Sequence, residues 1–434
     1  MPKRLMPTLV SRRAADARPL PVPPCRALCT GLSLVLTIVA VGAAGAQQPV
    51  TRAQAVAATL ANGPRVARAA PDVAAARAEV TGARAFQNPT ALLSYSGSVP
   101  RLHAELEVPL DFPWLRRARV GAAQASLASA RFRFAYERAS ARYEAEAAYV
   151  LALAAAERAR LSTRSAVAAD SLLRLARLRR DAGDASALDV ELTTVGAGQA
   201  AAAADADSLA AVAAPLDLQR VMGRGSDTVS IVLADSLSAP LNPEPWPLTP
   251  GRSPLNPEPW PLLVAAADAS LQAGERSLAL ARRSVFAAPS LTVGAEGSDP
   301  SGAEAGPLAL FGIALPLPLF NWNGAAVQAA AAARDRARVE RDVARRESEA
   351  AVAAARRELL AALRRVERDR ALLAGAQRVA ALSLLAYSEG AAALPGVLEA
   401  QRTAREALAA FVTDLAAANV AEAALRLVTA TEDR

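Results

Sequence analysis

Seven residues, Leu102-His-Ala-Glu-Leu-Glu-Val108, decide the class of fold, because apolar and polar side chains alternate along them without interruption. Successive side chains of a β-strand point to opposite faces, so this period of two predicts a strand with one apolar and one polar face. The apolar face carries Leu102, Ala104, Leu106 and Val108, and the polar face carries His103, Glu105 and Glu107.

Three further segments alternate in a similar way, namely Thr90–Tyr95, Ser290–Ala295 and Phe311–Leu315. Strands with one apolar face and one polar or small face are typical of the wall of a membrane β-barrel. A pair of soluble hairpins has the same pattern, and the strands alone favour neither interpretation.

Six aromatic residues flank these predicted strand pairs on the side of the helices. Rings gathered at one level are typical of a membrane–water interface, although packing in a core is the alternative explanation. The six residues are Phe86, Phe112 and Trp114 in the first half, and Phe286, Phe320 and Trp322 in the second.

The chain contains one unit twice. An offset of 207 residues pairs Gly183 with Gly390 and Val190 with Val397, and an offset of 200 pairs Pro89 with Pro289. Proline, glycine and β-branched positions that stay in register over such a distance indicate a duplicated structural unit. Each unit begins with an Ala- and Arg-rich helical stretch, at 73–85 or 262–285, which ends at a proline before the strand pair.

A very long helical stretch follows each strand pair, at Leu115–Arg180 and Gly324–Tyr387, with no proline in its interior. Some 65 residues at about 1.5 Å each predict helices of roughly 100 Å, and heptad-like apolar spacing predicts that they pack on other helices. A return helix ends near Gly223 or Ala430. We therefore expect a mainly α protein with a small β part, in which strand hairpins are set on long helical hairpins.

The N-terminus has the pattern of an export signal. Six basic residues precede the apolar core Gly31–Val41, and Ala44-Gly-Ala46 offers a small-x-small cleavage site. The apolar core is shorter than the ~20 residues that a membrane anchor needs. We predict a signal peptide at 1–46, a first repeat at 47–223, a Pro-rich linker at 224–262 and a second repeat at 263–434. Within the linker Pro240–Leu248 recurs at Pro254–Leu262, as a duplicated surface loop or, alternatively, a proline-rich ligand.

Composition argues against several classes of function. The net charge is +7, but the leader contributes +5 (six basic residues and Asp16), which leaves +2 and little support for a nucleic-acid partner. Both cysteines lie in the leader, and His103 is the only histidine. We therefore expect no enzyme activity, no metal site and no cofactor. Beyond the leader we find no apolar stretch of 18 or more residues free of charges and breakers, so we expect any membrane insertion to use strands.

The sequence resembles the TolC-like outer-membrane efflux family over about residues 51–430. The resemblance depends on Pro316-Leu-Pro-Leu-Phe-Asn-Trp-Asn-Gly324, on Tyr387-Ser-Glu-Gly390, and on Val397-Leu-Glu-Ala-Gln-Arg402. It implies a homotrimer whose four strands per chain form one transmembrane β-barrel, with the helices forming a periplasmic tunnel. It also implies a passive outer-membrane export channel whose partners are a periplasmic adaptor, an inner-membrane pump and outer-membrane lipid.

The resemblance assigns roles to several residues. Glu399 matches an acid at the periplasmic entrance of the tunnel, and Asp189 is the second gate candidate; a solvated position on a helix surface is the alternative for Glu399. His103, Glu105 and Glu107 face the barrel lumen. The adaptor-contact turns contain Gly183, Asp184, Ser186, Gly390 and Leu394.

The rival hypothesis is a soluble periplasmic coiled-coil or adaptor-type protein. We expect such an adaptor to have one helical hairpin between β-rich domains, whereas this chain has two long hairpins, each preceded by alternating strands.

Overall fold

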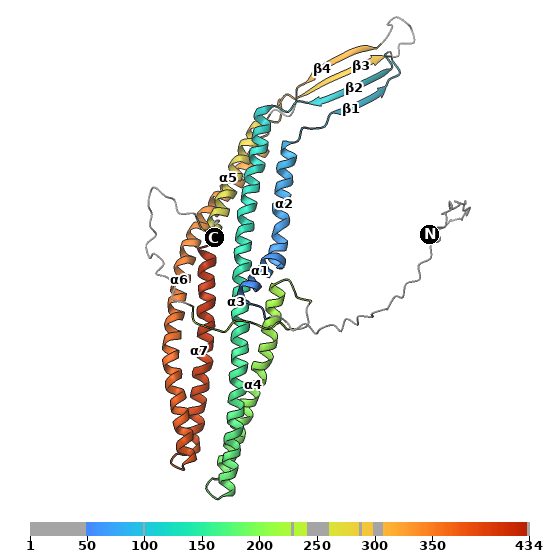
Figure 1. Cartoon of the computed structure of the whole chain (residues 1–434). Helices are drawn as coiled ribbons and strands as arrows, with labels where there is room; N and C mark the ends of the chain where they lie inside the picture. The colour runs from blue at the N-terminus through green and yellow to red at the C-terminus, as the bar shows by residue number, and fades with distance from the viewer. Residues whose placement is uncertain are drawn as a thin grey trace, which may run out of the picture. The chain divides into compact units, whose positions relative to one another are not determined.

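The computed structural model describes residues 49–98, 100–226, 230–240, 260–285, 289–297 and 307–431. Within them a helical part, a strand pair, a long helix and a shorter helix follow one another, and this order occurs twice (Figure 1). The first set contains α1 (Arg52–Asn62), α2 (Pro64–Arg84), β1 (Thr90–Tyr95), β2 (Leu102–Pro109), α3 (Pro113–Asp181) and α4 (Ala187–Val221). The second contains α5 (Leu262–Arg283), β3 (Ser290–Gly297), β4 (Leu308–Ala314), α6 (Gly324–Ser388) and α7 (Leu394–Val428).

The long helices confirm the predicted mainly α fold. α3 has 69 residues and α6 has 65, so at about 1.5 Å per residue each is roughly 100 Å long. The return helices α4 and α7 have 35 residues each and pack against α3 and α6 respectively. Both long helices lie within two residues of the predicted ranges, because proline and glycine mark their ends.

Both long helices end at a glycine with a left-handed backbone. Gly183 has φ +87°, and Gly390 has φ +76°. The amide of Asp184 donates to the carbonyl of Arg179 at 2.8 Å, and the amide of Ala391 donates to that of Ala386 at 2.8 Å. These are the hydrogen bonds of the Schellman motif, which reverses the chain into the following helix.

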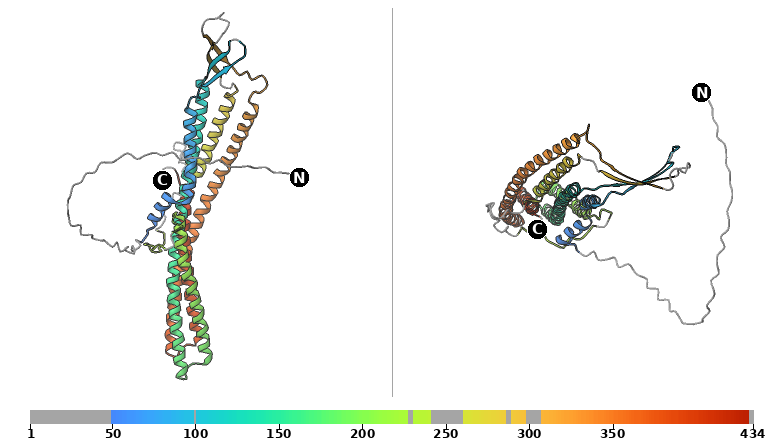
Figure 2. Two further views of the ribbon diagram at one scale, coloured as in Figure 1. Left: turned by 90° about the vertical axis from the view of Figure 1, so that its right-hand side faces the viewer. Right: turned by 90° about the horizontal axis from the view of Figure 1, so that it is seen from above.

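Small residues let the helices approach closely. At least one alanine on each of α3, α6 and α7 is fully buried between helices, for example Ala145, Ala362 and Ala418. α5 packs against both α3 and α6, and α2 packs against α3 (Figure 2). The hydroxyl groups of Ser129 and Ser270 lie 2.9 Å apart between α3 and α5. Apolar clusters are therefore distributed along the helices, as the Ala-rich composition predicts.

The N-terminal helical part is longer than the sequence suggests. The predicted stretch 73–85 covers only the second half of α2, and the sequence pattern missed α1 altogether. α1 begins at a capping box formed by Thr51 and Gln54, and α2 begins with Pro64 at its first position. The periodicity is weak in α2 because few of its residues are buried, and Pro71 interrupts the pattern.

Two irregular segments, 49–51 and 230–240, cross the middle of the helices and pair with each other. The amide of Val50 donates to the carbonyl of Val232 at 2.8 Å, and the amide of Ala234 donates to that of Val50 at 3.0 Å. The hydroxyl of Tyr149 on α3 lies 2.8 Å from the carbonyl oxygen of Val50 and 2.9 Å from Asp235 Oδ2. Burial raises the pKa of Tyr149 to about 12, so its proton is kept at neutral pH.

One buried carboxylate joins three helices at the same level. Glu146 on α3 forms ion pairs with Arg52 (3.0 Å), Arg142 (3.0 Å) and Arg426 (2.8 Å). These arginines belong to α1, α3 and α7, so the charge links the N-terminal helix and the last helix to α3. Because the Glu146 side chain is only 5% exposed, removing one of its partners leaves a buried charge less well compensated.

Two helices, α6 and α7, contain a window that is long and apolar enough to cross a membrane by length and composition. From the sequence we expected no such window beyond the leader, because we required a window free of charges. The windows in α6 and α7 each contain up to two charged residues. Both helices are Ala-rich and pack on each other, and core helices of soluble proteins pass the same test. Their hydropathy therefore does not assign them to a membrane.

Candidate functional site

The four strands form one antiparallel sheet in the order β1-β2-β3-β4. The pairing of β2 with β3 joins the two repeats, with Leu106 opposite Val293 and Leu102 opposite Gly297. β1 pairs only with β2, and β4 only with β3, so both outer strands leave an unpaired edge within the described residues.

The register places most of the apolar side chains of the four strands on one face. Directly opposite residues of an antiparallel pair share a face. One row of opposite residues runs across all four strands and contains Ala91, Leu106, Val293 and Phe311. This apolar face contains Ala91, Leu93, Tyr95, Leu102, Ala104, Leu106, Val108, Leu291, Val293, Ala295, Ala309, Phe311 and Ile313. The alternation is strict in β2 and β3, whereas Leu92 of β1 and Leu308 and Leu310 of β4 lie on the opposite face.

The apolar face is exposed in the single chain. Leu93 is 73% exposed, Phe311 74% and Ile313 75%, so no described part of the chain packs over the outer strands. A contiguous surface of large apolar side chains marks contact with a membrane or another protein.

The opposite face carries the three residues predicted for the barrel lumen. His103 Nδ1 lies 3.3 Å from Glu296 Oε1, and Ser290 Oγ donates to Glu107 Oε1 at 2.5 Å. Glu105 lies opposite Leu92 and Gly294. The structure thus brings His103, Glu105 and Glu107 onto one face, while their location in a lumen stays a prediction. Glu296 belongs to the same set, and extending the alternation of Ser290–Ala295 by one residue would have found it.

Aromatic residues lie where the strands join the helices. Phe86 is 69% exposed and Phe320 99%, and Trp114 and Trp322 are exposed as well, so packing in a core of this chain does not explain them. The rings of Phe112 and Trp114 stack with centroids 4.4 Å apart, and Arg116 lies over the ring of Phe86 at 4.5 Å. Phe286 lies outside the described residues.

The second set of candidate residues lies at the far ends of the long helices, where the hairpins turn. In the first turn, Ser186 caps α4: its hydroxyl accepts from the amide of Asp189 at 3.1 Å. Asp189 Oδ2 in turn accepts from the amide of Ser186 at 3.0 Å. This capping box gives the gate candidate Asp189 a structural role in the turn, and Gly183 and Asp184 lie in the same turn.

The second turn is held against α3. Leu394 is buried with Leu172, Tyr387 and Val397. The guanidinium of Arg179 lies 4.7 Å from the centre of the Tyr387 ring and donates to the carbonyl of Tyr387. The pKa of Tyr387 is raised by burial, although the charge of Arg179 opposes that change. The two helical hairpins are therefore joined close to their turns.

Glu399 lies in the second turn of α7 and is exposed. Its carboxylate accepts two hydrogen bonds from Arg402, one from Nε to Oε2 at 3.1 Å and one from Nη2 to Oε1 at 2.8 Å. These bonds lower the pKa of Glu399, so it is ionised at neutral pH. Its charge is balanced by Arg402, a partner that a motif-based assignment does not reveal.

The structure does not bring the two candidate sets together. The strand residues precede α3, and the turn residues follow it, so a helix of 69 residues separates them (Figure 1). Among the described residues no group of three or more His, Cys, Asp or Glu side chains is placed to hold a metal ion.

The sequence matches no model of a protein family and no curated protein. The fold, however, matches solved structures over most of the chain. A membrane protein from Pseudomonas aeruginosa is 20% identical with a TM-score of 0.72, covering 87% of this chain and 93% of that protein. The outer membrane protein VceC from Vibrio cholerae is 17% identical with a TM-score of 0.70, covering 88% and 96% respectively. The outer-membrane channel OprN is 18% identical with a TM-score of 0.70, covering 87% and 89%. The chain has the fold of these outer-membrane channels, as the resemblance to TolC-like proteins implied.

Proposed function

We propose that this chain is one protomer of a trimeric outer-membrane channel that acts as a passive export conduit, with its helices in the periplasm. The observation that carries the proposal is the open sheet with an uncovered apolar face. In lipid every backbone polar group needs a partner, so a four-stranded sheet with two edges has to close with other copies. Three copies give 12 strands, an even number within the range of bacterial barrels.

The edges of the helical part support the same assembly. α3 packs against α7, so the four helices lie in the order α4, α3, α7, α6, and the outer helices are α4 and α6. α4 contains five acidic residues and one arginine, a net charge of −4, whereas α6 contains thirteen arginines and eight acidic residues, a net charge of +5. In a ring of three copies α4 of one protomer meets α6 of the next, so the opposite charges favour closure.

The remaining parts of the proposal follow from this assembly. The leader 1–46, which lies outside the described residues, directs export, and the repeats 47–223 and 263–434 each supply two strands and one helical hairpin. As the family resemblance implies, the channel itself is passive, and we propose an inner-membrane pump and a periplasmic adaptor as its partners. The adaptor contacts the turns that contain Gly183, Asp184, Ser186, Gly390 and Leu394. Leu394 itself is buried, so its part is to hold the second turn in place.

The assembly is tested by fractionation and by measuring the oligomeric state. We expect the mature protein in the outer-membrane fraction, and we expect cross-linking in detergent to give a trimer. The apolar face should make extraction dependent on detergent. A monodisperse monomer that stays soluble without detergent would rule the proposal out in favour of a soluble periplasmic protein.

The charge at the entrance is tested in planar bilayers. Because Arg402 balances Glu399, we expect Glu399→Ala to lower cation selectivity only modestly and Arg402→Ala to raise it by exposing the unpaired carboxylate. Polyvalent cations added on the periplasmic side should block the Arg402→Ala channel more strongly. Asp189→Ala should act mainly on the stability of the turn. If neither Glu399→Ala nor Arg402→Ala changes selectivity, Glu399 is a solvated surface residue and the gate lies elsewhere.

A further inference from the structure

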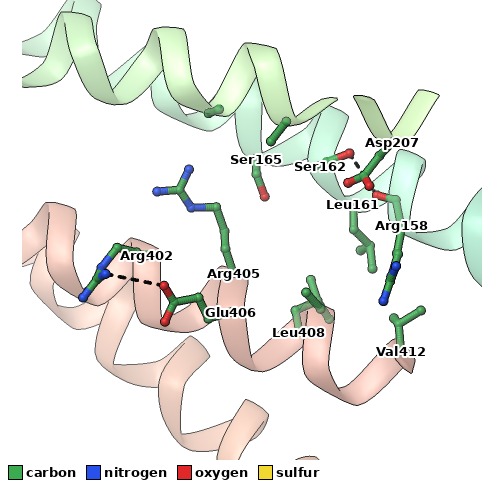
Figure 3. Close-up of a pocket in the computed structure, with 13 residues that line it drawn as sticks. Arg158, Leu161, Ser162, Ser165, Asp207, Arg402, Arg405, Glu406, Leu408 and Val412 are labelled. Atoms are coloured by element: carbon green, nitrogen blue, oxygen red, sulfur yellow. Dashed lines mark hydrogen bonds and ion pairs between the residues drawn. The ribbon is translucent and has the colours of Figure 1, made fainter. Parts of the chain in front are cut away.

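A cavity of about 410 Å³ lies between the two helical hairpins, and we call it the interhairpin pocket (Figure 3). Its walls come from α3, α4 and α7, which belong to one chain. On one side of it Val150 and Ala154 of α3 pack against Val412 and Ala416 of α7. On the other side Leu172 packs against Leu394 and Val397. The two helical hairpins thus pack against each other at these two clusters, and the pocket lies between the clusters.

Most of the pocket surface is apolar. Leu161 of α3 faces Leu408 and Val412 of α7, and alanines of α4 and α7 complete the wall. A volume of this size, lined by apolar side chains with a few polar groups, is typical of sites for small molecules.

Two arginines line the pocket without an acidic partner among the described residues. Arg158 donates to Thr413 Oγ1, and its Nε is buried with no hydrogen-bond partner. Arg405 makes one hydrogen bond, from Nε to the carbonyl of Gln401 at 3.2 Å. Figure 3 shows both side chains in the space between α7 and the α3/α4 hairpin. Burying part of a guanidinium group without a counter-charge costs free energy. Both arginines also have N–H groups that make no hydrogen bond to the described residues, so each can bind an anion.

The other charged residues of the pocket do not cancel this excess. Arg402 forms an ion pair with Glu406 at 3.6 Å and a shorter one with Glu399. Asp207 of α4 also lines the pocket but forms no ion pair with Arg158 or Arg405. Within the described residues, the pocket therefore contains two arginines that form no ion pair, Arg158 and Arg405, and one such acid, Asp207.

We propose that the interhairpin pocket binds an anionic amphiphile, a carboxylate or sulfonate on a compact apolar body. The anionic group lies with Arg158 and Arg405, and the apolar body lies against Leu161, Leu408 and Val412. Because Arg158 belongs to α3 and Arg405 to α7, one bound molecule bridges the two hairpins and fixes their spacing. The site lies within one protomer and goes beyond the proposed channel function, so it stands independently of trimer assembly.

The test uses the full mature protein in amphipol, so that detergent does not compete for the pocket. The probe is 2-naphthalenesulfonate, and its uncharged analogue 2-naphthol reports binding that ignores the charge. Equilibrium dialysis should show saturable binding of the sulfonate, and weaker binding of the naphthol. Arg158→Ala and Arg405→Ala should each weaken sulfonate binding about ten-fold or more, the loss typical of one charge-assisted hydrogen bond. Naphthol binding should change little.

Arg357→Ala is the matched control. Arg357 of α6 also donates through Nε to the carbonyl four residues earlier, that of Ala353 at 3.1 Å, but it does not line the pocket. It should leave sulfonate binding unchanged. Arg405→Gln keeps a long polar side chain and should weaken sulfonate binding as Arg405→Ala does. It replaces the alanine variant in the test if Arg405→Ala folds poorly. The absence of saturable sulfonate binding, equal binding of naphthol, or full binding in both arginine variants would each overturn the proposal.

Discussion

Leu106→Arg is expected to abolish insertion of the barrel, whereas Glu105→Arg, one residue away, leaves it largely intact. Leu106 lies in the middle of β2 on the apolar face, opposite Ala91 and Val293, and is 42% exposed in the single chain. An arginine on the lipid face near the middle of a bilayer costs about 2–4 kcal/mol. Three symmetric copies multiply that cost to roughly 6–12 kcal/mol per trimer, which is comparable to the stability of a whole domain.

Glu105→Arg is a matched control because it introduces the same arginine side chain on the same strand, one residue away. Glu105 lies on the polar face opposite Leu92 and Gly294. In the proposed barrel this face lines the lumen, where we expect water to solvate either charge. Both variants are compared by the amount of trimer in outer-membrane fractions after equal expression. Equal amounts of assembled trimer for the two would mean that the apolar face does not contact lipid, and the proposed barrel would fail with it.

The local sequence pattern predicts the strands and the long helices well for a physical reason. β2 and β3 have a strict period of two, β1 and β4 have a looser one, and each long helix has glycine or proline at its ends, so short-range information defines these elements. Register was not predicted, but the pattern restricts it: once Leu102–Val108 has an apolar face, a slip by one residue in a neighbouring strand turns the apolar side chains of that strand to the polar face.

What the sequence did not predict depends on contacts between distant residues. The pairing of Val50 with Leu233 and the three arginines around Glu146 join segments up to 280 residues apart, and no local pattern encodes them. Arg402 beside Glu399 is different, because a spacing of three on a helix makes that ion pair foreseeable. The family resemblance assigns a role to Glu399 and none to Arg402. The interhairpin pocket, too, appears only once α3 and α7 are placed side by side.

Gly223→Val is expected to have the second large effect, on the folding of the chain itself. Gly223 follows α4 with φ +79°, a conformation that β-branched residues avoid. A Cβ at this position would lie 2.2 Å from the carbonyl oxygen of Asn62 and 2.8 Å from its carbon, so the backbone between α1 and α2 would have to move. Backbone strain and overpacking each cost about 1–3 kcal/mol, giving roughly 2–6 kcal/mol together.

Two other glycines separate the two causes. Gly183 has a similar φ, +87°, but a Cβ there meets no atom within 4 Å, so Gly183→Ala should cost only the ~1–2 kcal/mol of the left-handed backbone. Gly198 lies inside α4 with open space around it, so Gly198→Ala should stabilise the helix by about 0.5–1 kcal/mol. Thermal unfolding of these variants and of Gly223→Ala is monitored by circular dichroism. The unfolding temperature should be highest for Gly198→Ala, followed by wild type, then Gly183→Ala, and lowest for Gly223→Ala. If Gly223→Ala and Gly183→Ala lower the unfolding temperature equally, the close approach of Gly223 to the α1–α2 junction contributes nothing to stability. The contacts of Tyr149 with Val50 and of Glu146 with Arg52 would then hold the N-terminal segment to α3.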